Sequence, residues 1–399
     1  MSIGPYSLVD STLREGEQFA YARFTTKDKI EIARALDTFG VEYIELSSPA
    51  SSPISLQDLK ILLDLGLRSK IVPHLRCDRK DIDLALGTGV RVVHMMFGTS
   101  PLLQSYSHGK TIDFICERAA EMTRYLKSEG VEVRFSGEDA FRSELEGLDR
   151  VFEAVTDAGV DRIGLPDTVG RATPFEVHDV VSRFREKFPD TQIEFHAHND
   201  TGCSVANSWA ALEAGATHID VTVLGIGERN GITPLGGLIA RLYGIDRHLV
   251  TKYDLKQLRQ LDELVASKLG IDIPFSNVLT SPTAFHHRAG IHTNAILRSP
   301  HSYEIFDLDD FGLTRTLDRA HRLIGKNVIK HRASELGLDL SEDLLYEVTW
   351  EIKTMSDQER LTPEFVDHLL REAAAGRFRP SMRFSKEGST MPNDFPKEK

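Results

Sequence analysis

The chain has 399 residues, of which 41% are hydrophobic and 27% charged, and its formal net charge is -12. This composition is that of a soluble globular protein, and its acidic balance argues against nucleic acid or an anionic membrane as the main partner. No apolar run reaches 18 residues, no signal peptide is recognisable, and the three cysteines are widely spaced, so we expect a cytoplasmic protein without a membrane span or disulfide framework.

Short apolar runs alternate with amphipathic stretches over the first 245 residues. We predict helices between the runs, for example at 27–40 and 143–159, because apolar residues recur there at helical spacing. The predicted strands are 6–12, 42–48, 69–77, 91–98, 132–139, 162–168, 192–199 and 218–225. Eight such units predict an α/β fold, a (β/α)8 TIM barrel. A doubly wound sheet is the alternative, but the first βα turn lacks G-x-G-x-x-G.

The pattern changes after the barrel segment 1–245. Residues 246–300 are predicted to hold a linker helix and a catalytic loop, and residues 301–376 a mainly helical C-terminal subdomain. The segment 377–399 is rich in proline, serine and charge, which predicts a disordered tail.

Polar residues recur at the carboxyl ends of the predicted strands, where TIM barrels carry their active sites. His196 and His198 stand two apart, so both side chains lie on one face of their strand. With Glu15 from the first strand end they form a two-histidine, one-carboxylate set for a divalent cation such as Zn, Mn, Mg or Co. The alternative is a pair of core or surface histidines without a metal.

Several other polar residues have both a functional and a structural interpretation. Arg14 suits the stabilisation of developing negative charge, or else a salt bridge on the rim. Arg134, His74 and Thr168 suit carboxylate binding, or else a solvated rim. His292, in a loop outside the barrel, suits proton transfer near neutral pH, although a lone loop histidine is commonly structural or exposed.

Four segments resemble one family, the homocitrate synthases. They are DSTLREGEQ (10–18), FHAHNDTGC (195–203), LGIGERNGITPLGG (224–237) and AFHHRAGIH (284–292). The resemblance extends from Leu8 to about residue 372. Isopropylmalate, citramalate and re-face citrate synthases are related barrels, but the 224–237 segment is most similar to the homocitrate synthases.

The resemblance implies a metal-dependent Claisen condensation of acetyl-CoA with a 2-oxo acid, followed by thioester hydrolysis, in a homodimer. The resemblance implies that the family's metal ligands correspond to Glu15, His196 and His198. The family's catalytic residues correspond to Arg14 and His292, supported by Glu228 and Tyr303. The substrate residues correspond to Arg14, Gln18, His74, His94, Arg134, Ser136, Glu138 and Thr168.

His94 departs from the family pattern, which has an aspartate at this position. An imidazole in place of a carboxylate favours a multiply charged anion over an ammonium group. Three acceptors therefore stay open: 2-oxoglutarate, giving a homocitrate synthase; phosphonopyruvate, giving a 2-phosphonomethylmalate synthase; and oxaloacetate, giving a re-citrate synthase. A metal-dependent acyl-CoA lyase or aldolase, or a barrel that only binds ligand, is the alternative from another class.

Overall fold

A computed structural model describes residues 3–381, and most of the predicted tail therefore lies outside the described residues. The chain forms two compact units. Among the described residues, the first contains 3–284 and Asp309–Leu313, and the second contains Phe285–Leu308 and 314–381.

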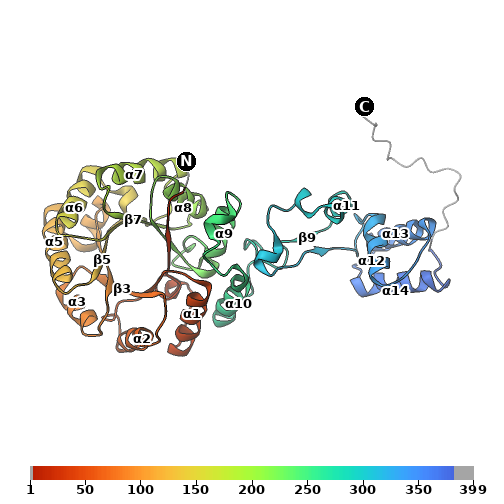
Figure 1. Cartoon of the computed structure of the whole chain (residues 1–399), viewed down its shortest axis with the longest axis horizontal. Coiled ribbons are helices and arrows are strands. Elements are labelled where there is room, and N and C mark those ends of the chain that lie inside the picture. Colours follow the sequence, from red (N-terminus) through yellow and green to blue (C-terminus); the bar gives the residue numbers. More distant parts are fainter. Residues whose placement is uncertain (1–2, 382–399) are drawn as a thin grey trace. The chain divides into compact units, whose positions relative to one another are not determined.

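The first unit is built on a closed barrel of eight parallel strands, with β1 paired to both β2 and β8 (Figure 1). The strands are β1 Ser7–Asp10, β2 Tyr43–Leu46, β3 Lys70–Arg76, β4 Val92–Gly98, β5 Glu132–Glu138, β6 Arg162–Asp167, β7 Gln192–Ala197 and β8 His218–Val221. All eight lie within the predicted ranges, and the predicted TIM barrel is confirmed.

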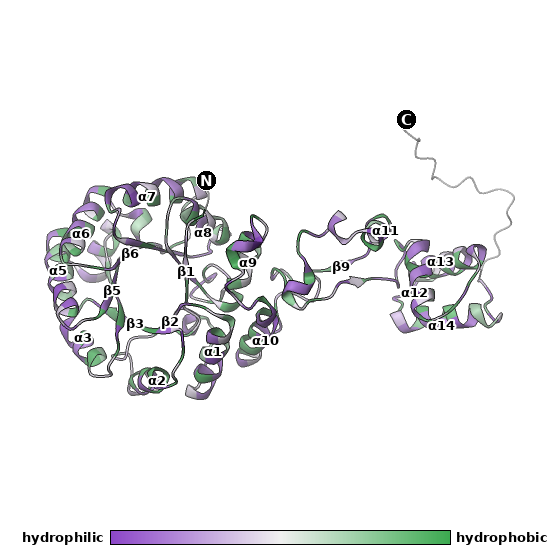
Figure 2. Ribbon diagram, viewed as in Figure 1, coloured by the Kyte–Doolittle hydropathy of each residue, from purple (hydrophilic) through white to green (hydrophobic). Residues whose placement is uncertain are grey.

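Helices surround the barrel and cover the outer face of its strands (Figure 1). They are α1 Thr26–Phe39, α2 Pro53–Leu63, α3 Arg79–Leu86, α5 Ile112–Ser128, α6 Leu145–Asp157, α7 Pro174–Lys187, α8 Ser204–Glu213 and α9 Leu235–Tyr243, with the short α4 Pro101–Leu103 and, beyond them, α10 Leu258–Leu269. Hydrophobic and hydrophilic residues alternate around them (Figure 2). Phe39, Phe152 and Phe184 are fully buried, so the apolar core lies between strands and helices.

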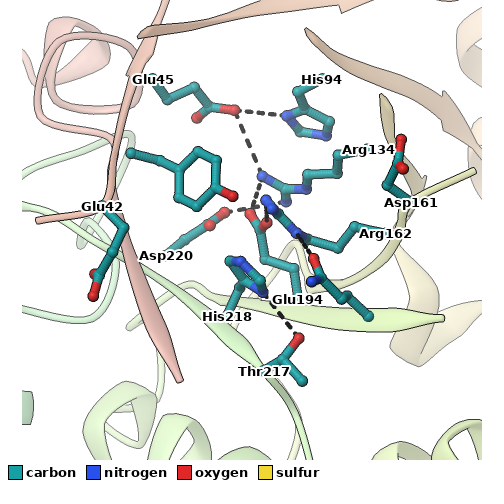
Figure 3. A network of polar contacts seen from close by, with 12 residues as sticks. Glu42, Glu45, His94, Arg134, Asp161, Arg162, Glu194, Thr217, His218 and Asp220 are labelled. Carbon is teal, nitrogen blue, oxygen red and sulfur yellow. Dashed lines mark hydrogen bonds and ion pairs between the residues drawn. The ribbon is translucent and has the colours of Figure 1, made fainter. Parts of the chain in front are cut away.

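The barrel interior is partly apolar and partly charged: it holds the cluster Val9, Tyr43, Val72 and Val92, and beside it buried arginines and carboxylates. Arg134 of β5 forms ion pairs with Glu194 of β7 and Asp220 of β8, and lies 3.7 Å from Glu45 of β2 (Figure 3). Arg162 of β6, the register partner of Arg134 in β5, pairs with Glu194 and Glu132. Buried ions on this scale persist only when each has a partner of opposite charge.

The second unit is mainly helical. Its elements are β9 His286–His287, α11 Gly290–Arg298, β10 Thr316–Leu317, α12 Lys326–Glu335, α13 Glu342–Ser356 and α14 Pro363–Ala374. Buried Ile329, Val348, Ile352 and Leu370 form a core between α12, α13 and α14. Within residues 3–381, no helix combines the length and apolar character that crossing a bilayer requires.

Loss of one buried cation should destabilise the barrel strongly. Arg162→Leu removes the partner of two carboxylates, and we expect a loss of about 3–5 kcal/mol in the free energy of unfolding. The matched control is Arg259→Leu, because the Arg259–Glu263 pair is exposed and should contribute under about 0.5 kcal/mol. Urea denaturation followed by circular dichroism measures both; equal midpoints for the two variants would contradict the prediction.

Candidate active site

One cavity of about 180 Å³ lies at the carboxyl ends of the barrel strands. Residues from seven strands or the loops that follow them line it, which is the position expected for a TIM-barrel active site. Twelve residues singled out from the sequence meet there, together with Met96 and Pro166: Arg14, Glu15, Gln18, His74, His94, Arg134, Ser136, Glu138, Thr168, His196, His198 and Glu228.

The turn after β1 places Glu15 against the histidines of β7. Glu15 follows the strand in a tight turn and is only 2% exposed. Its Oε1 accepts a hydrogen bond from the backbone N–H of Glu228 at 2.8 Å. A Cβ at Gly227 would lie 2.9 Å from the Glu15 side chain, so glycine lets this loop approach the carboxylate.

Glu15, His196 and His198 each offer a ligand atom, and these atoms lie within 4.8 Å of one another. His196 Nδ1 is 2.8 Å from Asp220 Oδ2, which leaves Nε2 free for a cation. The buried Nδ1 of His198 has no hydrogen-bond partner among the described residues, and Nε2 lies 4.0 Å from Glu15. Two neutral imidazoles and a carboxylate fit a divalent cation well.

The protonation states of these three side chains also favour metal binding. Burial, reinforced by the charge of Arg14, lowers the pKa of His196 to about 4. Burial and the neighbouring His196 lower the pKa of His198 to about 4. For Glu15, burial alone would raise the pKa, but Arg14 and the two histidines lower it. All three side chains are therefore in the form that binds a cation at neutral pH.

A second group, Glu45, His74 and His94, has similar spacing but a different electrostatic setting. Glu45 Oε2 accepts hydrogen bonds from Arg14 Nε at 2.7 Å and from Ser11 at 2.6 Å. The guanidinium of Arg134 lies 3.7 Å from Oε1. Two positive charges already balance this carboxylate, so the group is not suited to a divalent cation.

Arg14 bridges the two groups. Its Nε donates to Glu45 and its Nη1 to Glu15, which fixes the guanidinium above the barrel interior. A positive charge held in this position beside the metal ligands can neutralise an oxyanion that forms there.

The side of the cavity formed by β5 and β6 can bind an anion. The two Nη atoms of Arg134 are engaged with barrel carboxylates, but its buried Nε has no partner among the described residues. A Cβ at Gly164 would lie 2.0 Å from Ser136 Oγ, so glycine at 164 makes room for that hydroxyl. Thr168 Oγ1 accepts a hydrogen bond from the backbone N–H of Asp139. Burial and then Asp139 raise the pKa of Glu138.

His292 and Tyr303 belong to the second unit. Their rings lie 4.3 Å apart between centroids, and both side chains are exposed. Nearby in the chain, Glu304 is 4% exposed and accepts hydrogen bonds from His287 and Arg315, which ties this segment together.

Three carboxylates that orient the predicted site residues were not predicted from the sequence: Glu45, Glu194 and Asp220. Each stands in a short apolar strand segment, YIEL, IEF and HIDV respectively. A carboxylate at an alternating position within such a segment could have indicated a charged barrel interior.

Comparison with known proteins agrees with this architecture. Residues 6–265 match the family described as HMGL-like, and residues 279–360 match the domain described as homocitrate synthase post-HMGL domain-like. The mitochondrial homocitrate synthase of Schizosaccharomyces pombe is 49% identical over 388 residues, which cover 97% of this chain and 92% of that protein. The cytosolic isozyme of Saccharomyces cerevisiae is 46% identical, covering 99% and 92%.

More distant relatives agree. A homocitrate synthase of Sulfolobus acidocaldarius is 37% identical, covering 87% of this chain and 74% of that protein. The crystal structure of a Bacillus subtilis HMG-CoA lyase has a TM-score of 0.61 at 21% identity and covers 69% of this chain and 98% of that one, which shows a shared fold. The fold is that of the HMGL-like barrels. Within that class, the chain belongs to the homocitrate synthase family.

The lowered histidine pKa values predict unusual acid tolerance of metal binding. Protons compete for His196 and His198 only as the pH approaches about 4. The affinity of the metal-free protein for Mn²⁺, measured by isothermal titration calorimetry, should therefore stay nearly constant from pH 8 to about pH 5.5. Two histidines with ordinary pKa values would lose about 100-fold over this range. Such a loss would contradict the prediction, and Glu15→Gln should weaken binding at every pH.

Proposed function

We propose that the chain condenses acetyl-CoA with 2-oxoglutarate and hydrolyses the resulting thioester, releasing homocitrate and CoA. One observation carries this proposal: in a chain 46–50% identical to homocitrate synthases over nearly its whole length, two histidines and a carboxylate converge in the barrel cavity. The same relatives do not favour phosphonopyruvate or oxaloacetate as acceptor. The chain's likeness to HMG-CoA lyases is one of fold alone.

The proposed roles follow from the contacts of each residue. Glu15, His196 and His198 hold a divalent cation, with Zn, Mn, Mg and Co as candidates. When bound, the cation supplies Lewis acidity at the keto group of the acceptor. Arg14, held by Glu15 and Glu45, offsets negative charge on the keto oxygen as the new carbon–carbon bond forms.

The acceptor's far end is assigned to the β5–β6 side of the cavity. The free Nε–H of Arg134 and the Ser136 hydroxyl face this region with Thr168, and they suit an anionic group. His74, His94, Gln18 and Glu138 complete the proposed pocket. Glu228 contributes its backbone N–H to Glu15, while its side chain is more than half exposed.

His292 is the proposed base that removes a methyl proton from acetyl-CoA, with Tyr303 packed beside its ring. We further propose that His292 acts on the barrel of a second subunit in a homodimer. The exposed apolar side chains Ile291 and Ile305, 74% and 72% exposed, flank this segment in the second unit and support such contact. A cytosolic location is also proposed, as for the cytosolic isozyme of Saccharomyces cerevisiae, although other relatives are mitochondrial enzymes.

An acceptor panel tests the proposed substrate. Purified protein, acetyl-CoA and Mn²⁺ are mixed in turn with 2-oxoglutarate, oxaloacetate, phosphonopyruvate, 2-oxoisovalerate and pyruvate, and release of free thiol is followed. We expect the highest kcat/KM with 2-oxoglutarate. Preference for any other acceptor would refute the homocitrate assignment while leaving the condensation chemistry intact.

His292→Ala should lower kcat by about 10²–10⁴-fold, the usual contribution of a general base. Binding of 2-oxoglutarate, measured by calorimetry, should change little because the pocket residues belong to the barrel. His368→Ala, which removes an exposed histidine of α14, is the matched control and should leave kcat unchanged. An unchanged kcat in His292→Ala would remove this residue from catalysis.

Mixed dimers test the shared site. Glu15→Gln and His292→Ala should each be nearly inactive alone. After the two variants are unfolded and refolded together, activity should return if each site combines a barrel from one subunit with His292 from the other. No recovery despite dimer formation would place both residues in the same subunit's site.

A further inference from the structure

A continuous hydrogen-bonded chain runs from the barrel interior to the cavity wall through Glu45, His94 and Ser136. His94 Nδ1 lies 2.6 Å from Glu45 Oε1, and its Nε2 lies 2.9 Å from Ser136 Oγ. The three residues are 0%, 2% and 2% exposed. Figure 3 shows the first of these bonds beside Arg134. In a chain of carboxylate, imidazole and hydroxyl such as this one, the carboxylate determines which ring nitrogen of the histidine carries the proton.

The position of each proton follows from the charges around the chain. Burial would raise the pKa of Glu45, but Arg14 and hydrogen bonds from His74 and His94 hold it well below its usual range. Ionised Glu45 can only accept, so His94 Nδ1 carries a proton and donates it. The groups facing His94 are Glu45 from β2, His74 from β3, and Arg134 and Ser136 from β5.

Burial, with the charges of Arg134 and His74, lowers the pKa of His94 well below its ordinary value. In the free protein His94 is therefore neutral, and its Nε2 lone pair accepts the O–H of Ser136. The oxygen of Ser136 then turns only lone pairs towards the cavity. A carboxylate placed there meets an acceptor where it needs a donor.

We propose that His94 is a specificity-determining residue that takes up one proton when the far carboxylate of the acceptor binds, so that Ser136 is released to donate its hydroxyl hydrogen to that carboxylate. This inference rests on the proposed function, because it assumes an acceptor with a second carboxylate. In the bound state the imidazolium donates from Nδ1 to Glu45 and from Nε2 to Ser136. The added positive charge lies between two carboxylates, that of Glu45 and that of the ligand.

Calorimetry of the metal-loaded protein counts the proton directly. 2-Oxoglutarate is titrated at pH 7.5 in buffers of different ionisation enthalpy, without acetyl-CoA. We expect close to one proton taken up per site, and an affinity that weakens about tenfold per pH unit as the pH rises towards the bound-state pKa of His94. Binding without proton uptake would overturn the proposal. If 2-oxoglutarate does not bind, the proposed function fails separately, and the count is made with the acceptor that the panel identifies.

Two variants assign the proton to a residue. His94→Asn keeps a donor to Glu45 but has no group that titrates, so proton uptake and the pH dependence of 2-oxoglutarate affinity should both disappear. Glu138→Gln removes a half-buried cavity carboxyl whose pKa is raised; whatever its effect on affinity, the number of protons taken up per bound acceptor should stay the same. Uptake that persists in His94→Asn, or disappears in Glu138→Gln, would overturn the role of His94. Where His94→Asn does not fold, His94→Gln serves in its place, because it also lacks a group that titrates near neutral pH.

Discussion

The geometry of the site depends on one buried guanidinium. Arg134 lies inside the barrel with 3% of its surface exposed and faces three carboxylates from three other strands. Without it, the carboxyl groups of Glu45, Glu194 and Asp220 would share one buried space without the positive charge that lies between them. Their contacts with Arg134 therefore help to hold these side chains in place.

Those carboxylates then orient the two sides of the active site. Asp220 fixes the ring of His196 through Nδ1, which leaves the other ring nitrogen as the candidate metal ligand. Glu45 fixes Arg14 on one side and His94 on the other. A buried ionic network of this kind is poor evidence of stabilisation, since well-packed apolar residues could fill the same space. The ionic network inside the barrel is better explained by the way it positions the residues of the candidate active site.

The sequence predicted the barrel, and it predicted most of the residues that line the candidate site, for the same reason. Short apolar strands with polar carboxyl ends make a regular pattern, and closure of the barrel brings those ends together whatever the detailed register. The sequence did not predict the charged group inside the barrel, because its carboxylates are isolated residues in separate strands: Glu45, Glu194 and Asp220. Two observations are needed to show that these carboxylates face one arginine. Alternate side chains of each barrel strand point inward, and the structure places all three carboxylates beside Arg134. The proposed roles of His292 and Tyr303 involve a second subunit, whose position a single sequence does not encode locally.

The histidine at position 94 is understandable within this charged interior. An aspartate there, as the family resemblance leads one to expect, would place a second carboxyl group against Glu45. Two carboxylates in contact cannot both be ionised, so such a pair would share a proton or recruit a cation from the cavity. The imidazole instead donates to Glu45 and remains neutral, and the partners of Glu45 already include Arg14 and Ser11. One substitution therefore removes the negative charge that an ammonium group in the cavity would need, and it places a group that can accept a proton beside Ser136.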